Sequence, residues 1–195
     1  MASPQIDGRR RRSERSRVAI VQALLDLIGE KILEPTAQQV AERAGVDITT
    51  VFRHFSDMET LYRAMSDQLM EVMWPLAVEG GPDPGAPLDA RVRDFAARRA
   101  AFFERVSPYE QASVAPRQRS PVLREQRQLA IRSLRADMLR WLPEVRQAGP
   151  DRVEAIDLAS SFEAWDRLRS GQRLGRARAQ SAMETMLMVL VQGLA

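Results

Sequence analysis

Four side chains able to bind a polyanion or a polar ligand lie close together in the stretch RAGVDITTVFRHF, residues 43–55: Thr49, Thr50, Arg53 and His54. Threonine offers a hydroxyl and a methyl group, and arginine offers a planar fork of N–H donors that fits phosphate or guanine. His54 is the only histidine of the chain, which excludes a histidine-rich metal site, and no G-x-S-x-G motif surrounds a serine. We therefore predict binding chemistry here, with no catalytic residue, no metal and no cofactor.

The composition narrows the class of protein further. The 195 residues are 45% hydrophobic and 28% charged, which suits one sizeable core or a small domain joined to a larger one. Cysteine is absent, so disulfides, zinc fingers and thiol catalysis are excluded. The segment GGPDPG at 80–85 has prolines where a phosphate-binding loop needs backbone donors. No apolar run reaches the ~18 residues that cross a bilayer, so we expect a soluble, cytoplasmic protein without a membrane partner.

Positive charge is concentrated near the N-terminus. The net charge is only +3, yet residues 9–17 hold six arginines and a single acid. We expect residues 1–12 to be a disordered basic arm, with Arg10, Arg11 and Arg12 contacting DNA phosphates or the minor groove. A solvated tail with no partner is the alternative.

Apolar residues recur at three- and four-residue spacing along most of the chain, and strand signals are nearly absent, so an all-α fold of about nine helices is predicted. Residues 79–87, with three prolines and three glycines, are expected to be a loop. The expected helices are 13–31, 36–44, 48–54, 57–76, 88–105, a short helix that begins at Ser107-Pro108, 121–142, 150–170 and 175–194.

Two of these helices carry clear local signals. Thr36 followed by Gln39 is a capping box, Gly45 ends the same helix, and Asp47 is a good N-cap for the next one. Two helices joined by a short glycine turn follow the helix-turn-helix plan, in which the second helix enters the ~12 Å major groove of DNA. Residues 48–54 are therefore the predicted recognition helix.

Residues 13–69 resemble the DNA-binding domain of TetR-family transcriptional regulators. The resemblance rests on an amphipathic first helix, then PTAQQVAERAGVDITTVFRHFSDMETLY, then a long connecting helix. It implies a helix-turn-helix domain at 13–57 that contacts DNA. Together with the recognition-helix argument, the expected DNA-binding residues beyond the arm are Thr36, Asp47, Ile48, Thr49, Thr50, Phe52, Arg53 and His54.

Some of these positions have a second interpretation. Phe52 stands where the family usually has tyrosine, and Met58 stands where a lysine often contacts phosphate. Two contacts to the phosphate backbone of DNA are therefore missing. Thr36 can act as a helix cap alone, and His54 can simply pack beside Phe55. The alternative function is therefore a helical protein-interaction module whose helix-turn-helix no longer binds DNA.

For residues 58–195 the resemblance implies a helical domain that binds an effector and dimerises. Five large apolar residues are candidates to line the effector pocket, although they can equally be plain core: Phe102, Phe103, Met138, Trp141 and Phe162. The last helix is apolar nearly all round, so it is predicted to pair with a second copy of the chain or else to be buried in its own core. The predicted dimer seam contains Trp165, Met183, Met186, Leu187, Leu190 and Leu194.

These expectations combine into one function. A dimer presents two recognition helices to a palindromic operator in double-stranded DNA. A small-molecule effector that fits only one arrangement of the dimer would shift its affinity for DNA. The sequence thus predicts a repressor released by a small molecule.

Overall fold

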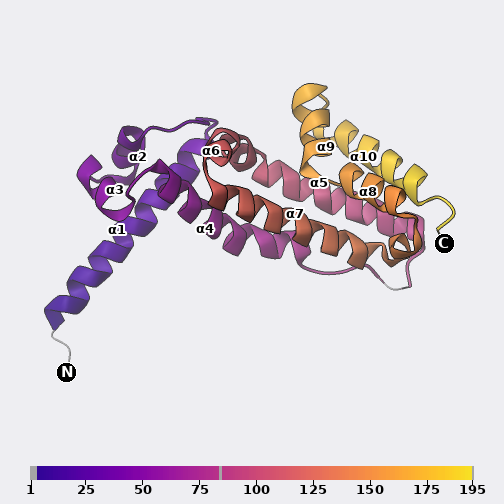
Figure 1. The fold of residues 1–195 in the computed structure, drawn as a ribbon, viewed down its shortest axis with the longest axis horizontal. Coiled ribbons are helices and arrows are strands. Elements are labelled where there is room, and N and C mark those ends of the chain that lie inside the picture. The colour runs from indigo at the N-terminus through magenta and orange to yellow at the C-terminus, as the bar shows by residue number, and fades with distance from the viewer. Residues whose placement is uncertain (1–3, 84, 195) are drawn as a thin grey trace. The chain divides into compact units, whose positions relative to one another are not determined.

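The computed structural model describes residues 4–83 and 85–194. The regular elements among these residues are all helices, with no strand, which confirms the predicted all-α fold (Figure 1). None of the helices described is long and apolar enough to cross a membrane. The α-helices are α1 (Pro4–Gly29), α2 (Ala37–Ala44), α3 (Ile48–His54), α4 (Met58–Val78), α5 (Leu88–Ala112), α6 (Val114–Arg119), α7 (Pro121–Trp141), α8 (Pro150–Ala159), α9 (Phe162–Asp166) and α10 (Arg176–Val191). A short 3-10 turn spans Pro143–Gln147, and a π-helical turn spans Arg167–Gly171.

The chain divides into two compact units. The first contains the residues up to 71 together with 108–125, and the second contains 72–107 together with the residues from 126 onward. This division differs from the expected boundary between 57 and 58, because most of α4 and the segment from Pro108 to Glu125 group with the first unit.

The core of the first unit lies between α1 and the helices that follow it. Its buried side chains include Ile20, Leu24 and Ile28 from α1, Val40 from α2, Val51 from α3, the adjoining Phe55, and Leu61 and Met65 from α4. Ala112 and Leu123, from the later segment of this unit, are buried in the same cluster. Burial of Val51 and Phe55 fixes which face of α3 points outward.

Helix α1 begins well before the core does. Residues 4–12, expected to be part of a disordered arm, are helical, while residues 1–3 of that arm lie outside the described residues. Arginine is a good helix former. The guanidinium groups of Arg12 and Arg15 also donate to the carbonyls of Gly8 and Arg11, one turn earlier, at 3.3 Å. These local bonds favour the helical backbone in this segment.

The core of the second unit is built around three aromatic residues. Phe95 and Phe103 of α5 and Trp165 of α9 are almost completely buried. The surrounding buried residues come from α5, α7, α8, α10 and the residue that follows α7, and they include Val92, Ala96, Met138, Trp141, Leu142, Ile156, Met183 and Leu187.

Two predicted helix boundaries were wrong. Pro108 does not begin a new helix, because α5 continues through it to Ala112. A proline inside a helix leaves one carbonyl without its amide partner. Nearby, the Ser107 hydroxyl donates to the carbonyl of Phe103 at 2.6 Å.

The predicted helix over 150–170 is interrupted at two adjacent serines. Helix α8 ends at Ala159, and the hydroxyl of Ser161 then accepts from the amide of Ala164 at 3.2 Å, which makes Ser161 the N-cap of α9. Serine competes with helical backbone bonding in this way.

Candidate nucleic-acid interface and a pocket of the second unit

Helices α2 and α3 are joined by a turn whose geometry depends on Gly45. The Thr36 hydroxyl accepts from the amide of Gln39 at 3.2 Å, and the Gln39 side chain accepts from the amide of Thr36 at 2.9 Å, so the predicted capping box is confirmed. Gly45 has φ 67° and ψ 33°, which is left-handed backbone. The amide of Val46 donates to the carbonyl of Ala41 at 3.0 Å and closes the turn.

Asp47 fixes the start of α3. Its Oδ1 accepts from the amide of Thr49 at 2.7 Å and from the Thr49 hydroxyl at 2.6 Å, which confirms the predicted N-cap. The side-chain and backbone hydrogen bonds from Thr49 lower the pKa of Asp47. A capping carboxylate repels phosphate, so we assign Asp47 to holding the helix. The Thr49 hydroxyl donates to Asp47, so only its lone pairs and its methyl group remain available on the exposed side of α3.

The outward face of α3 is polar with one exception. Thr49 and Arg53 are exposed, Thr50 is half-buried, and no carboxylate among the described residues pairs with Arg53. Phe52 is 48% exposed, which is unusual for a large aromatic side chain on a short helix. Ile48 is half-buried and packs against the first core. The structure therefore brings together two threonines, an arginine and a phenylalanine on one accessible face.

His54 points partly toward the protein. Its Nε2 is buried without a hydrogen-bond partner among the described residues, and its ring lies 6.4 Å from that of Phe55. Burial and the charges of Arg53 and Arg17 lower its pKa, so the imidazole is neutral at physiological pH. In this conformation His54 adds no positive charge to the face of α3.

Two further contacts stabilise the first unit around α3. Arg43 of α2 donates to both carboxylate oxygens of Glu30, at 2.9 and 2.7 Å, and this fork connects α2 to the end of α1. Met58 opens α4 and packs, partly buried, against the first core.

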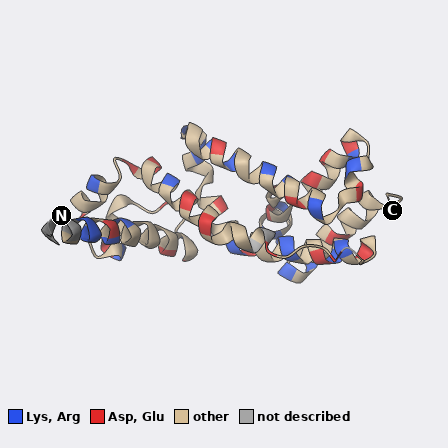
Figure 2. Ribbon diagram, turned by 90° about the horizontal axis from the view of Figure 1, so that it is seen from below, with Lys and Arg blue, Asp and Glu red and all other residues tan. Residues whose placement is uncertain are grey.

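The N-terminal half of α1 is a cationic helix. Arg10, Arg11 and Arg12 are exposed, and Figure 2 shows basic residues concentrated near this end of the chain. At ~100° per residue these three charges lie on different sides of the helix. No single face of this helix therefore carries all three charges.

Substitution of Gly45 by alanine tests the turn. We expect a loss of about 1–2 kcal/mol in the free energy of unfolding, because an L-residue is strained at positive φ. An added Cβ would meet nothing within 4 Å, so the loss reports backbone strain and not a clash. Chemical denaturation followed by circular dichroism measures it. Gly81→Ala, where φ is not positive, is the matched control and should change stability by less than ~0.5 kcal/mol.

The second unit contains a cavity of about 260 Å³. Its apolar lining comes from Ile131 and Leu134 of α7, Leu158 of α8 and Phe162 of α9. The remaining lining is polar or charged: Arg99, Arg127, Glu154, Asp157, Ser160, Ser161 and Glu163.

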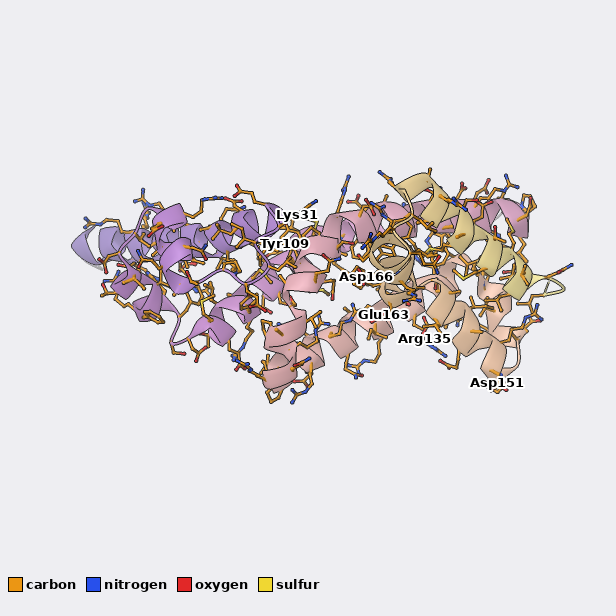
Figure 3. The ribbon with its side chains drawn as sticks, turned by 90° about the horizontal axis from the view of Figure 1, so that it is seen from above. Lys31, Tyr109, Arg135, Asp151, Glu163 and Asp166 are labelled. Carbon is orange, nitrogen blue, oxygen red and sulfur yellow. The ribbon has the colours of Figure 1, made fainter. Side chains whose placement is uncertain are left out.

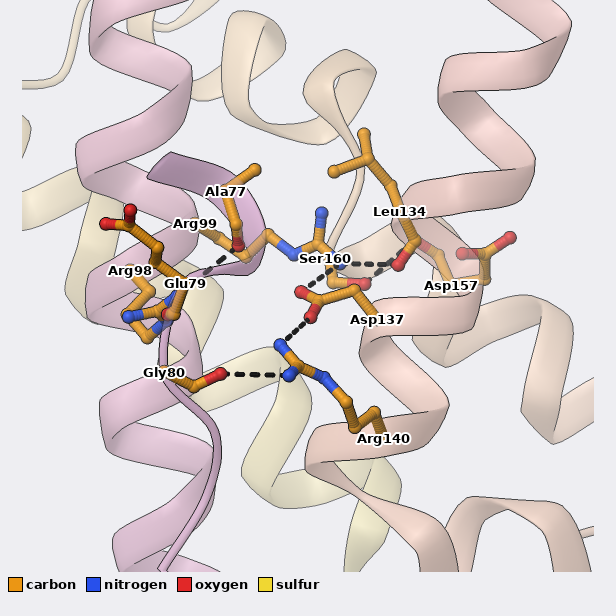
Figure 4. A network of polar contacts seen from close by, with 10 residues as sticks. All are labelled: Ala77, Glu79, Gly80, Arg98, Arg99, Leu134, Asp137, Arg140, Asp157 and Ser160. Carbon is orange, nitrogen blue, oxygen red and sulfur yellow. Dashed lines mark hydrogen bonds and ion pairs between the residues drawn. The ribbon is translucent and has the colours of Figure 1, made fainter. Parts of the chain in front are cut away.

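Arg99 is the least exposed charged residue beside this cavity, with 3% of its surface accessible. Its Nη2 donates to the carbonyl of Leu134 at 2.5 Å and lies 3.3 Å from Oδ2 of Asp137 (Figure 4). Asp137 is also bound by Arg140 at 2.7 Å, and Arg140 reaches the carbonyl of Gly80 at 2.9 Å. Burial lowers the pKa of Arg99 to about 10, so the guanidinium remains protonated at neutral pH.

The other charged residues around the cavity are paired nearer the surface. Arg127 donates to Glu163 at 2.5 Å, and Arg135 donates to Glu154 at 2.6 Å and to Asp157 at 3.0 Å. Figure 3 labels Arg135 and Glu163 among the side chains of the second unit. The carboxylates of Glu154 and Glu163 are more than half exposed, whereas the Arg127 side chain is 11% exposed.

The predicted pocket residues divide between this cavity and the core. Phe162 lines the cavity. Phe103, Met138 and Trp141 are buried in the second core, and Phe102 packs against that core with part of its surface exposed. The cavity thus uses one aromatic residue of the predicted set.

The predicted seam residues also separate into two groups. Trp165, Met183 and Leu187 have no accessible surface, so in this conformation they pack inside their own chain and leave nothing for a second copy. Met186, Leu190 and Leu194 are partly buried and pack on the outside of the same core. Packing against α8 and α9 therefore accounts for much of the apolar surface of α10.

The sequence analysis missed the buried ion pair of Arg99 and Asp137. A signal for it existed, because Arg99 follows Val92 and Phe95 and precedes Phe103 at the spacing of one apolar helix face. A charged residue at such a position must be paired or hydrogen-bonded when the helix packs.

A capped helix, a glycine turn and a second helix with an exposed polar face together make a helix-turn-helix domain. Residues 20–65 match the family described as bacterial regulatory proteins, tetR family. The predicted resemblance is confirmed over these residues.

Solved structures extend the likeness to the whole chain. One is a TetR transcriptional regulator from Rhodococcus sp. RHA1, with a TM-score of 0.59 and 21% identity over 92% of this chain and 97% of that one. Another is a transcriptional regulator from the same organism, with a TM-score of 0.67 and 19% identity over 93% of this chain and 96% of that one. At this identity the likeness establishes the fold. No curated protein sequence matches the chain.

Proposed function

We propose that the protein is a cytoplasmic transcriptional repressor that binds a palindromic DNA operator as a homodimer and is released by a small-molecule effector. The exposed polar face of α3, held by the Gly45 turn and the Asp47 cap within a tetR-family domain, is the observation that carries this proposal. The major groove of DNA accepts one α-helix with its side chains. Thr49, Thr50 and Arg53 are the residues assigned to base edges and phosphates.

Dimerisation is assigned to the outer surfaces of α8 and α10. Val189 of α10 and Leu158 of α8 are among the most exposed large apolar residues, and Met186 and Leu190 are partly exposed beside them. Apolar surface of this kind favours burial against a second copy. The cavity of the second unit supports the effector part of the proposal.

Selection of bound sequences from a random DNA pool tests the proposal. The winning sequence is then titrated at two salt concentrations, and the mass of the complex is measured by light scattering. Enrichment of a palindrome, bound by two chains with a steep salt dependence, is the expected result. Weak binding without enrichment would contradict it.

Neutralising the arginines of α1 should flatten the salt dependence. We expect replacement of Arg10, Arg11 and Arg12 by glutamine to lower the slope of log K against log salt by up to ~3 per chain, because each neutralised phosphate contributes about 0.9. Fluorescence anisotropy at several salt concentrations measures it. The matched control removes the same charge from exposed positions of the second unit: Arg105, Arg132 and Arg178. An equal change in both variants would assign the effect to net charge alone.

A protein-interaction module that does not bind DNA is the second candidate. It is favoured by the exposed Phe52 and by Met58, which packs into the core where a phosphate-binding lysine is often found. Under this alternative the DNA selection yields no sequence, and Phe52→Ala weakens binding to a protein.

A further inference from the structure

The exposed residues of α3 all lie on one face of the helix. Thr49, Phe52 and Arg53 are exposed, whereas Val51 is buried and the remaining residues of α3 are half-buried. Positions i, i+3 and i+4 are neighbours on a helix surface, so Thr49 is the centre of this face and the other two stand on either side of it. Phe52 therefore belongs to the same surface as the two polar residues assigned to DNA.

The packing of α3 keeps Phe52 at the surface. Val51 and Phe55 have 2% and 3% of their surface accessible, and Ile48 packs against the same core. A rotation of α3 that buried Phe52 would bring these apolar side chains into water, which is unfavourable. The Asp47 cap also holds the start of the helix. The Phe52 side chain, 48% exposed, thus stays open to whatever binds this face.

Phenylalanine reads a base edge only through apolar contact. Its side chain has no hydrogen-bonding atom, so it neither bonds phosphate nor matches the donor and acceptor pattern of the bases. The apolar group that base pairs present in the major groove is the C5-methyl group of thymine, and phenylalanine is among the side chains that pack against it. Arg53, on the same face, forms no ion pair with a carboxylate among the described residues and supplies the charge that a polyanion requires.

We propose that Phe52 determines operator specificity by packing its ring against the C5-methyl group of a thymine in each half-site. This inference rests on the proposed function, because it requires α3 in the major groove, and it names the base that one residue selects. Thymine at that base pair is preferred over cytosine, which lacks the methyl group. In a palindrome bound by two chains the contact occurs twice.

Replacement of thymine by deoxyuridine tests the contact, because it removes the methyl group and leaves the hydrogen-bonding pattern of the base unchanged. In the operator selected from the random pool, each symmetric pair of thymines is replaced in turn, and fluorescence anisotropy at one salt concentration gives the Kd of the full chain. We expect one pair to weaken binding by about fourfold per half-site, roughly 10- to 15-fold in total, as for one buried methyl group in each half-site. If no pair changes the Kd, Phe52 does not contact a thymine methyl group.

Two variants assign the methyl effect to a side chain. Phe52→Ala should bind the thymine and deoxyuridine operators with Kd values within about twofold of each other, because the two changes remove the same contact. Thr49→Ser removes the other methyl group of this face, keeps the hydroxyl that donates to Asp47, and should retain the methyl effect in full. Circular dichroism checks that both variants are folded. A methyl effect that persists in Phe52→Ala, or that disappears in Thr49→Ser, contradicts the proposal.

Selection of DNA by the Phe52→Ala chain is an independent measurement. The selected sequence should lose its preference for thymine at that base pair and keep its preferences at the neighbouring base pairs. An unchanged selected sequence overturns the proposal.

The same measurements separate this inference from the proposed function. An enriched palindrome without a methyl effect leaves the repressor standing and refutes the role of Phe52. A methyl effect that requires Phe52, on a site bound by a single chain, supports the contact and refutes the homodimer. Failure to enrich any sequence refutes both and favours the protein-interaction module.

Discussion

Replacing Arg53 by alanine is expected to weaken operator binding by roughly 30-fold or more. A well-placed arginine fork on a base contributes about 1–3 kcal/mol, and a palindrome uses it twice. Arg53 is exposed on α3, and no carboxylate among the described residues forms an ion pair with it. All N–H donors of its guanidinium are therefore available to DNA. Fluorescence anisotropy with the selected operator gives the change in Kd, and circular dichroism confirms that the variant is folded.

Arg53→Lys distinguishes a base contact from a phosphate contact. Lysine keeps the charge but lacks the fork, so it should restore most of the affinity if Arg53 contacts phosphate and little if it reads guanine. Arg105→Ala, an exposed arginine on α5, is the control and should leave the Kd unchanged. If Arg53→Ala binds the operator as tightly as the natural chain, α3 is not the recognition helix.

Removing Asp137 should produce the largest loss of stability. We expect Asp137→Leu to lower the free energy of unfolding by about 3–5 kcal/mol, because Arg99 then remains buried without its counter-charge. Urea unfolding followed by tryptophan fluorescence measures this, since Trp141 and Trp165 lie in the same core. Glu154→Leu removes an acid that is largely exposed and should have little effect.

The double variant Arg99→Met/Asp137→Leu completes a double-mutant cycle for this ion pair. Replacing both members of a buried ion pair by apolar residues is often neutral or stabilising, so most of the lost stability should return. If the double variant is as unstable as Asp137→Leu alone, the loss arises from packing around residue 137 and not from an unpaired guanidinium.

The local features of the first unit were predictable from a few residues. Thr36, Gly45 and Asp47 act through hydrogen bonds and dihedral angles within four residues, so their sequence signals and their structural roles coincide. The orientation of α3 follows from the burial of Val51 and Phe55 on one face of a short helix.

The features that depend on tertiary packing were not predictable in the same way. Pro108 is an ordinary helix-start signal, yet packing carries α5 through it. Met183 and Leu187 lie in an apolar helix of the kind that commonly forms an interface, but neighbouring helices of the same chain bury both side chains. The Arg99–Asp137 pair joins residues 38 positions apart on two helices, so spacing along the sequence cannot indicate it. Residues facing the cavity are likewise fixed by how helices pack.

The first unit, which contains the helix-turn-helix, is not one continuous length of chain. The chain passes through the second unit at residues 72–107, and residues 108–125 belong to the first unit again. This later segment contributes Ala112 and Leu123 to the core formed with α1 to α4. A fragment that stops near residue 71 would keep the recognition helix but expose the apolar surface beneath those side chains. Chimaeras that exchange only the N-terminal segment with another regulator would therefore pair mismatched surfaces, and a successful transplant must carry both pieces of chain.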